Sequence, residues 1–235
     1  MALGLAVARG ETMPTPADFG WSVLAGMAGA IGITALYKGL AVGRMGIVAP
    51  VTGVIAALIP VTAGILLEGV PQPLVLVGIG LAIVAVVLVS RVTDEGSGPS
   101  GLGLALLAGV GLGALSVFIA QISDGHAFGP LVAIRGTEAV LIGAAVVVTR
   151  AAWRPGRRLL PAIAAVGVLD MLGNGAFILA VQAGALAVAA VLSSLYPVTT
   201  VVLATVLLKE RVTRDHAAGI GLAGVAIICI AAGST

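Results

Sequence analysis

The chain alternates between long apolar stretches and short polar links. The links are mostly a few residues long and are rich in glycine, proline or charged residues. A helix needs about 20 mostly apolar residues to cross the hydrocarbon layer of a bilayer. The pattern therefore predicts eight membrane-spanning helices, over residues 18–40, 45–67, 71–90, 101–121, 127–149, 159–182, 185–208 and 215–233.

Composition supports this interpretation. Hydrophobic residues make up 60% of the chain and charged residues 9%, whereas a soluble domain carries roughly a quarter charged residues. The mean hydropathy is +1.20. We therefore expect an all-α integral membrane protein whose surroundings are the lipid bilayer. The net charge of +2 is attributed to lysine and arginine in loops that set the orientation in the membrane. Because only 3% of the residues are aromatic, no nucleic-acid partner is expected.

Part of the pattern occurs twice. Residues 78–86 read GIGLAIVAV, and residues 219–227, which lie 141 positions later, read GIGLAGVAI. At the same offset the spans 18–40, 45–67 and 71–90 map onto 159–182, 185–208 and 215–233. The chain crosses the membrane five times between a span and its copy, so the copy enters from the opposite side. This predicts an inverted five-helix repeat, an architecture typical of secondary transporters.

The repeat divides the chain at the link of residues 91–100, RVTDEGSGPS. Residues 101–235 are expected to form a complete second repeat, helices 6–10 of a ten-helix scheme. Residues 1–94 are expected to form an incomplete first repeat, with the end of helix 2 followed by helices 3–5. By this offset the first one and a half helices are missing, and about 40 or more residues are expected to precede the chain.

Lysine and arginine are distributed unequally between the two sides of the membrane. When the links are assigned to alternate sides, ten of these residues fall on one side and two on the other. Positively charged links are typically cytoplasmic. The count therefore predicts a cytoplasmic 150–158 link and a C-terminus outside the cytoplasm.

The run VAAVLSSLYPVTTVVLATVLLKE at residues 188–210, followed by GIGLAGVAI, resembles EamA-type members of the drug/metabolite transporter superfamily. Arg135 is at a position that also fits the family, and residues 48–68 repeat the pattern as VAPVTGVIAALIPVTAGILLE. The resemblance implies ten helices in two inverted halves and transport of a small metabolite or drug. Family members commonly have both termini in the cytoplasm, which is opposite to the charge count, so the orientation stays open.

Two charged residues lie three positions apart within the span 127–149. An ionised side chain at the bilayer centre costs on the order of 3 kcal/mol. Arg135 and Glu138 share one face of a helix and form a candidate ion pair. This pair is either structural, or Arg135 engages an anionic group and Glu138 carries a proton or a cation.

Asp170 lies in the middle of span 159–182, with Asn174 one turn later. Gly173 and Gly175 are expected to let a neighbouring helix or a ligand approach closely. We expect Asp170 to be a substrate or coupling residue, or alternatively the buried partner of Arg135. Its counterpart in the first repeat is Gly29, so the predicted site is asymmetric.

Prolines interrupt two of the spans and are candidate sites of kinking and gating. A proline frees a carbonyl one turn earlier, which serine or threonine side chains help to satisfy. Polar side chains around Pro197 therefore either repair a kinked helix locally or line a polar cavity, and Pro50 and Pro60 with Thr52 and Thr62 present the same alternatives. The polar side chains near Pro197 are Ser193, Ser194, Tyr196, Thr199 and Thr200.

The remaining polar residues point to less specific roles. Lys38 near the end of its span is expected to extend to the membrane interface, with a substrate contact as the alternative. Glu68 and Glu210 are expected to be interfacial charges or helix caps. Asp124 and His126 share a link and give only a weak signal for a metal or a proton relay.

No motif of a membrane protease, a serine hydrolase or a nucleotide-binding loop occurs, so we expect neither an enzyme nor a cofactor or metal. The predicted function is secondary transport of a small metabolite or drug by alternating access, with protons or cations as possible coupling ions. The expected location is the cytoplasmic membrane of a bacterium. The alternative is a non-transporting membrane scaffold or a degenerate transporter subunit.

Overall fold

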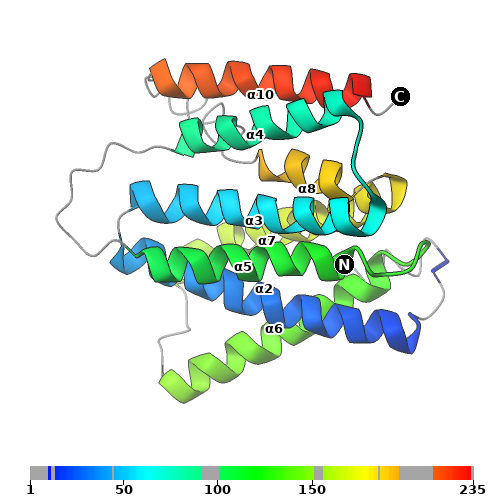
Figure 1. The fold of residues 1–235 in the computed structure, drawn as a ribbon. Coiled ribbons are helices and arrows are strands. Elements are labelled where there is room, and N and C mark those ends of the chain that lie inside the picture. Colours follow the sequence, from blue (N-terminus) through cyan, green and yellow to red (C-terminus); the bar gives the residue numbers. More distant parts are fainter. Residues whose placement is uncertain are drawn as a thin grey trace. The chain divides into compact units, whose positions relative to one another are not determined.

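The computed structural model describes residues 10–11, 14–43, 45–90, 101–150, 156–184, 186–195 and 214–233. These residues form eight α-helices and one 3-10 turn, and no strand (Figure 1). The elements are α2 (Pro16–Val42), α3 (Met45–Glu68), α4 (Pro73–Ser90), α5 (Leu102–Ile119), α6 (Phe128–Thr149), η1 (Arg157–Leu159), α7 (Leu160–Ala183), α8 (Leu186–Ser194) and α10 (Arg214–Gly233).

The prediction of an all-α membrane protein is confirmed. Seven of the predicted spans agree with helix ends to within two residues, if η1 and α7 are taken together; the eighth, 185–208, contains α8 and continues outside the described residues. Shorter apolar helices occur at Pro73–Leu88 and Ala217–Ile230. The helices long and apolar enough to cross a membrane, among the residues described, are Pro16–Val42, Ile47–Glu68, Leu102–Ile119, Phe128–Thr149 and Arg157–Ala183.

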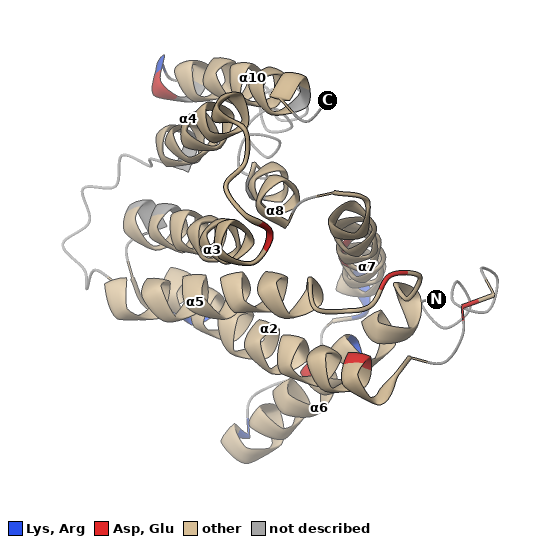
Figure 2. Cartoon of the chain, turned by 45° about the vertical axis from the view of Figure 1, so that its right-hand side comes forward, with Lys and Arg blue, Asp and Glu red and all other residues tan. Residues whose placement is uncertain are grey.

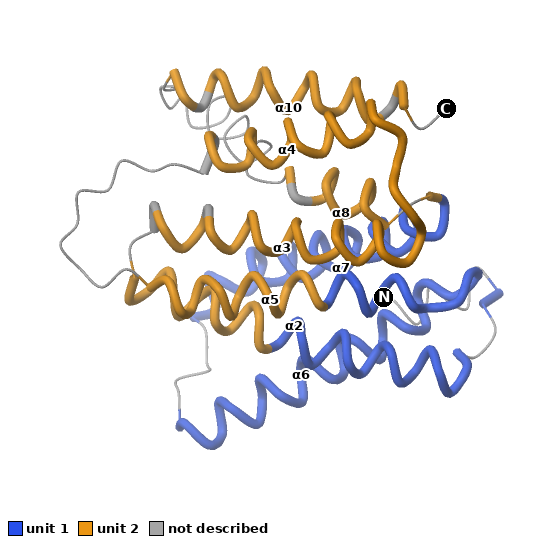
Figure 3. Tube along the Cα trace, viewed as in Figure 1, with its two compact units in different colours: residues 1–30, 115–183 blue, residues 31–114, 184–235 orange. Residues whose placement is uncertain are grey.

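The chain forms two compact units (Figure 3). Unit 1 comprises Met1–Ala30 and Leu115–Ala183, and unit 2 comprises Ile31–Ala114 and Gly184–Thr235. These units are not the sequence repeats, because each unit takes helices from both halves of the chain. The repeat boundaries at 1–94 and 101–235 stay a prediction.

Unit 2 pairs helices that the sequence relates by duplication. The end of α10 lies at the start of α4, where Gly233 packs against Val75, and α4 and α10 therefore run antiparallel. The end of α3 likewise meets the start of α8, where Glu68 contacts the backbone of Leu186. Equivalent helices of an inverted repeat run in opposite directions, as α4 and α10 do, and the repeat itself stays a prediction. The buried core of this unit is Val61, Val75, Ile79, Ala82, Ala85, Val86, Ala187, Val191, Leu195, Ala223, Ala226 and Ile230.

The helix ends recur at the offset seen in the sequence. α2 spans residues 16–42, and η1 with α7 spans 157–183, which is 141 positions later at both ends. The starts of α3 and α8 and the starts of α4 and α10 differ by the same 141 positions. The duplicated sequence pattern therefore corresponds to duplicated helix boundaries.

Gly78 permits the close approach of α4 and α10. A Cβ atom at this position would lie 2.7 Å from Ile230 Cγ1 and 2.9 Å from the Ala226 carbonyl oxygen. We expect Gly78→Val to lower the free energy of unfolding by about 1–3 kcal/mol, because the added atoms overfill a packed interface. Thermal unfolding of the purified protein in detergent measures the effect.

Gly80 provides the matched control for this prediction. It lies on the same helix, and a Cβ atom there would meet no described atom within 4 Å. Gly80→Val is expected to leave the melting temperature almost unchanged. Equal losses in the two variants would contradict the proposed packing of α4 against α10.

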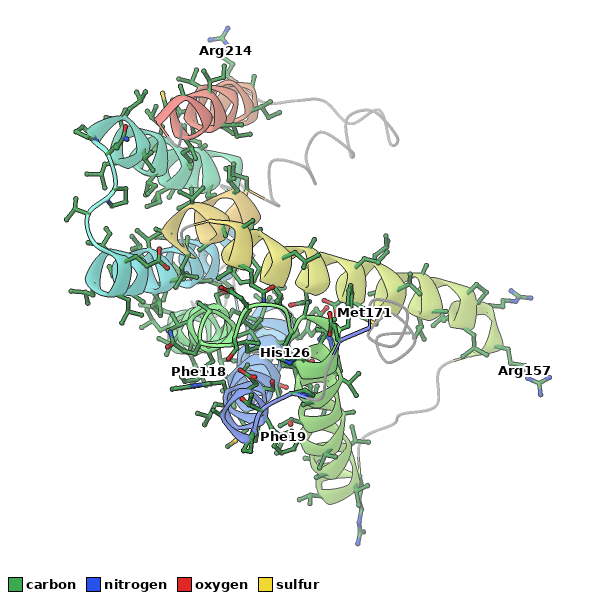
Figure 4. All side chains as sticks on the ribbon, turned by 90° about the vertical axis from the view of Figure 1, so that its right-hand side faces the viewer. Phe19, Phe118, His126, Arg157, Met171 and Arg214 are labelled. Carbon is green, nitrogen blue, oxygen red and sulfur yellow. The ribbon has the colours of Figure 1, made fainter. Side chains whose placement is uncertain are left out.

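In unit 1 the first half of α6 is enclosed and the second half is not. Phe128, Leu131 and Ile134 of α6 are buried together with Ala25 of α2 and Ile178 of α7. Farther along α6, Val140, Val147 and Val148 are exposed, and exposed apolar side chains also cover the first half of α7, which begins at the Arg157 end in Figure 4. Apolar exposure of this kind is expected for helices that face lipid.

Charged residues are mainly confined to the ends of helices and to the links. In Figure 2 the helices are tan over most of their length, with colour chiefly at their ends. α2 begins with a capping box, in which the Asp18 backbone N–H donates to Thr15 Oγ1 and the Thr15 N–H donates to Asp18 Oδ2, each at 3.1 Å. Charged residues within a span are therefore exceptions that need an explanation.

Candidate functional site

The main exception is a charged triad in unit 1, formed by Arg135 and Glu138 of α6 and Asp170 of α7. One terminal nitrogen of the guanidinium, Nη1, lies 2.5 Å from Glu138 Oε2. The other, Nη2, lies 2.5 Å from Asp170 Oδ2. The structure thus brings together the predicted pair on α6 and the separately predicted residue on α7, and the second contact joins the two helices.

The three side chains differ in exposure. Glu138 is 12% exposed, Arg135 is 32% exposed and Asp170 is 52% exposed. Asp170 is therefore the accessible carboxylate of the triad, and Glu138 is the enclosed one. Asp170 was expected to be either a substrate or coupling residue or the buried partner of Arg135. It contacts Arg135, but it is not buried.

The position of Arg135 follows from the local sequence. Leu131 and Ile134 place one face of α6 in the core of unit 1, and Arg135 follows at the edge of this face. Glu138 is three residues later and is therefore on the same side of the helix as Arg135. The Nε atom of Arg135 is buried and has no hydrogen-bond partner among the described residues. The guanidinium is thus bound through its terminal nitrogens and retains one enclosed donor.

Asn174 completes the α7 part of the site. Its Nδ2 donates to the Asp170 carbonyl oxygen at 2.8 Å and to Asp170 Oδ1 at 3.2 Å. Each oxygen of the Asp170 carboxylate therefore has a polar partner, Asn174 for one and Arg135 for the other. Gly175 lies close to α6, with a Cβ position 3.3 Å from Phe128 Cε1. A Cβ atom at Gly173 would meet no described atom within 4 Å, so no described helix approaches there, and the approach of a ligand stays a prediction.

The triad has two carboxylates and one guanidinium. Paired charges within a membrane are less costly than isolated ones, and such residues commonly mark solute or ion pathways. With all three groups ionised, one negative charge is left over. A proton, a cation or a positively charged group of a solute would neutralise this excess.

The predicted proline sites are only partly within the described structure. Pro50 and Pro60 lie in the continuous helix α3, and Pro60 is buried, whereas the side chain of Pro50 is not described. Ser194 is the last residue of α8 and its side chain is likewise not described. Tyr196 and Pro197 lie outside the described residues. Their roles in binding or gating stay predictions.

The hydrogen bonds described for the threonines that follow these prolines go to carbonyls other than those that the prolines free. Those carbonyls belong to Gly46 and Ala56, four residues before each proline. Thr62 Oγ1 instead donates to the carbonyls of Leu58 and Ile59, each at 2.9 Å. Thr52 Oγ1 donates at 3.2 Å to the carbonyl of Ala105 in α5, and so links two helices of unit 2.

The link between α5 and α6 is held by side chains that the sequence analysis missed. Asp18 is 1% exposed, and its Oδ1 accepts a 2.8 Å hydrogen bond from the Ser123 N–H. Glu11 Oε2 accepts from the N–H groups at the start of α6, and Gln182 of α7 donates to the carbonyls of Ser123 and His126. The T-x-x-D pattern at residues 15–18 was the available signal, because it is a helix-start motif. These contacts fix the start of α6, in the half of the helix that contains Arg135.

The structure also describes most of the other polar residues that the sequence analysis singled out. Glu68 is a cap, since its two carboxylate oxygens accept from the Leu186 N–H at 3.1 and 3.0 Å. Lys38 lies exposed near the end of α2, and Asp124 lies exposed in the α5–α6 link. Within the part of the chain that is described, no cluster of three or more histidine, cysteine or acidic residues is placed to bind a metal. Glu210 lies outside this part.

Comparison with known proteins agrees with the membrane fold. No curated protein sequence matches the chain. A solved crystal structure of another protein has a TM-score of 0.71 and 17% sequence identity, over 98% of this chain and 92% of that one, and such a likeness shows the fold alone. Residues 99–232, more than half of the chain, match the EamA-like transporter family. The chain belongs to the EamA-like transporter family.

Proposed function

We propose that this membrane transporter moves a small organic solute by alternating access in the cytoplasmic membrane of a bacterium, and that Arg135, Glu138 and Asp170 form its binding and coupling site. The observation that carries the proposal is the guanidinium of Arg135, which contacts carboxylates of two different helices within membrane-spanning segments. Charged groups of this kind are rare inside membranes and commonly mark transport pathways.

The two ion pairs of Arg135 suit different tasks. The pair with Glu138 is within α6 and is largely enclosed, so it fixes the guanidinium on its own helix. The pair with Asp170 joins α6 to α7 through the exposed carboxylate. A proton or a cationic group that neutralises Asp170 weakens this bridge and lets the two helices separate. Binding at the site is thereby coupled to a change in helix arrangement, which alternating access requires.

Transport by purified protein in liposomes tests the proposal. The panel contains amines, carboxylates, amino acids and nucleosides, each measured with and without an imposed proton gradient, and empty liposomes are the control. We expect time-dependent uptake of at least one class of solute and a change in its rate when the gradient is imposed. Correctly inserted protein that moves none of these solutes would favour the alternative, a non-transporting scaffold.

A further inference from the structure

We propose that Gly29 on α2 is a positioning residue for the charged triad, because its missing side chain makes the space that holds the Glu138 carboxylate. This inference rests on the proposed function, since it assigns Gly29 a part in the same site. Gly29 has no side chain that could bind a solute or an ion. Its role is to leave free the space that the Glu138 carboxylate occupies.

The geometry at Gly29 is restrictive. A Cβ atom built at this residue would overlap Glu138 Oε1, and Leu115 Cδ2 lies 3.5 Å from the same point. The other oxygen of this carboxylate, Oε2, contacts Arg135. Glu138 therefore fills the gap between the α2 backbone and the guanidinium, and its low exposure agrees with this enclosure.

The repeat gives Gly29 a particular meaning. Gly29 and Asp170 are 141 positions apart, so they are equivalent residues of α2 and α7. Asp170 contacts Arg135, and a Cβ atom at Gly29 would overlap Glu138. One position supplies a carboxylate to Arg135, and the other supplies room for the carboxylate of Glu138. An acidic residue at both positions would place three carboxylates around a single guanidinium.

It follows that α2 controls the orientation of Arg135 through Glu138. An added methyl group at position 29 displaces the Glu138 carboxylate and, with it, the Nη1 side of the guanidinium, whereas Asp170 keeps its place on α7. Small displacements of groups at a site are costly, since an error of about 1 Å reduces rates by up to about 100-fold. We therefore expect Gly29→Ala to lower kcat about 10- to 100-fold.

Shortening the glutamate tests this role specifically. Glu138→Asp removes one methylene group and so makes room for the methyl group of Gly29→Ala. Glu138→Asp alone is expected to lower kcat, because it shortens the side chain that contacts Arg135. The double variant Gly29→Ala/Glu138→Asp is expected to recover part of the activity lost in Gly29→Ala, so that its kcat lies above the value that the two single losses predict together. The transported solute is the member of the panel with the fastest wild-type uptake, and kcat and KM are measured separately.

Gly26 is the matched control on the same helix. A Cβ atom there would lie 2.6 Å from the Ile134 carbonyl oxygen and 2.7 Å from Thr137 Cβ, so Gly26→Ala disturbs the same pair of helices through nearest atoms that do not belong to Glu138. Glu138→Asp is expected to give no recovery in the Gly26→Ala protein. Equal recovery with both glycine variants, or no recovery with either, would overturn the proposal.

A second measurement separates this inference from the proposed function. Melting temperatures in detergent are determined for Gly29→Ala, Glu138→Asp and the double variant. We expect the loss caused by Gly29→Ala to be smaller in the Glu138→Asp background. This coupling is expected even if no panel solute is transported, an outcome that would count against the proposed function alone. Independent, additive losses would refute the placement of Glu138 against Gly29.

Discussion

Asp170→Asn is expected to abolish gradient-driven solute uptake while the protein continues to fold. The substitution keeps the size of the side chain but removes the charge that binds Arg135 at 2.5 Å. Arg135 keeps its ion pair with Glu138 in this variant, so its charge is not left unpaired and we expect only a small loss of stability. We expect a fall in kcat of about 100-fold or more, which is typical when a group essential for a step is removed. Initial uptake rates at matched protein content measure it.

Asp124→Asn is the control for this variant. It removes the same charge from an exposed residue of the α5–α6 link and is expected to leave uptake unchanged. The melting temperature of Asp170→Asn is expected to stay close to that of the wild type. Wild-type uptake in Asp170→Asn would remove this residue from the proposed site, and a large fall in melting temperature would assign it a structural role instead.

Arg135→Met is expected to reduce both stability and transport. Removing the guanidinium leaves two carboxylates without their cation, and Glu138 is the more enclosed of the two. A buried polar group that loses its partner costs about 1–3 kcal/mol. Uptake is expected to fall to background, because the variant lacks the ion pair that joins α6 to α7. Thermal unfolding and uptake are measured on the same preparations.

A neutral triad separates the two effects of this substitution. The triple variant Arg135→Met/Glu138→Gln/Asp170→Asn leaves no unpaired charge, and replacing a whole ionic cluster often preserves stability. We expect its melting temperature to return toward the wild-type value while uptake stays at background. Recovery of both properties would mean that the triad serves folding alone.

The helix positions were predictable because they depend on the length and apolar content of each stretch and on the residues that close it. The ends of α4, α6 and α10 agree with their predicted spans to within two residues, since each span is closed by glycine, proline or charge. The pairing of Arg135 with Glu138 was also predictable, because the spacing within a helix fixes it.

Contacts between helices were not predictable to the same extent. Helices that are apolar on all sides give little indication of which face meets which neighbour. The sequence therefore left open whether Asp170 binds Arg135 or a solute, and it gave no sign that Gly29 lies against Glu138. The supporting contacts of Asp18, Glu11 and Gln182 were missed for a related reason, since they join distant segments to one link.

The most direct test of the account compares solute uptake by the wild-type protein with uptake by the neutral-triad variant, in liposomes that contain equal amounts of folded protein. The account predicts gradient-dependent uptake by the wild type and only background uptake by the variant. Equal uptake by the two proteins would contradict the claim that the Arg135–Glu138–Asp170 triad is the site of solute binding and coupling.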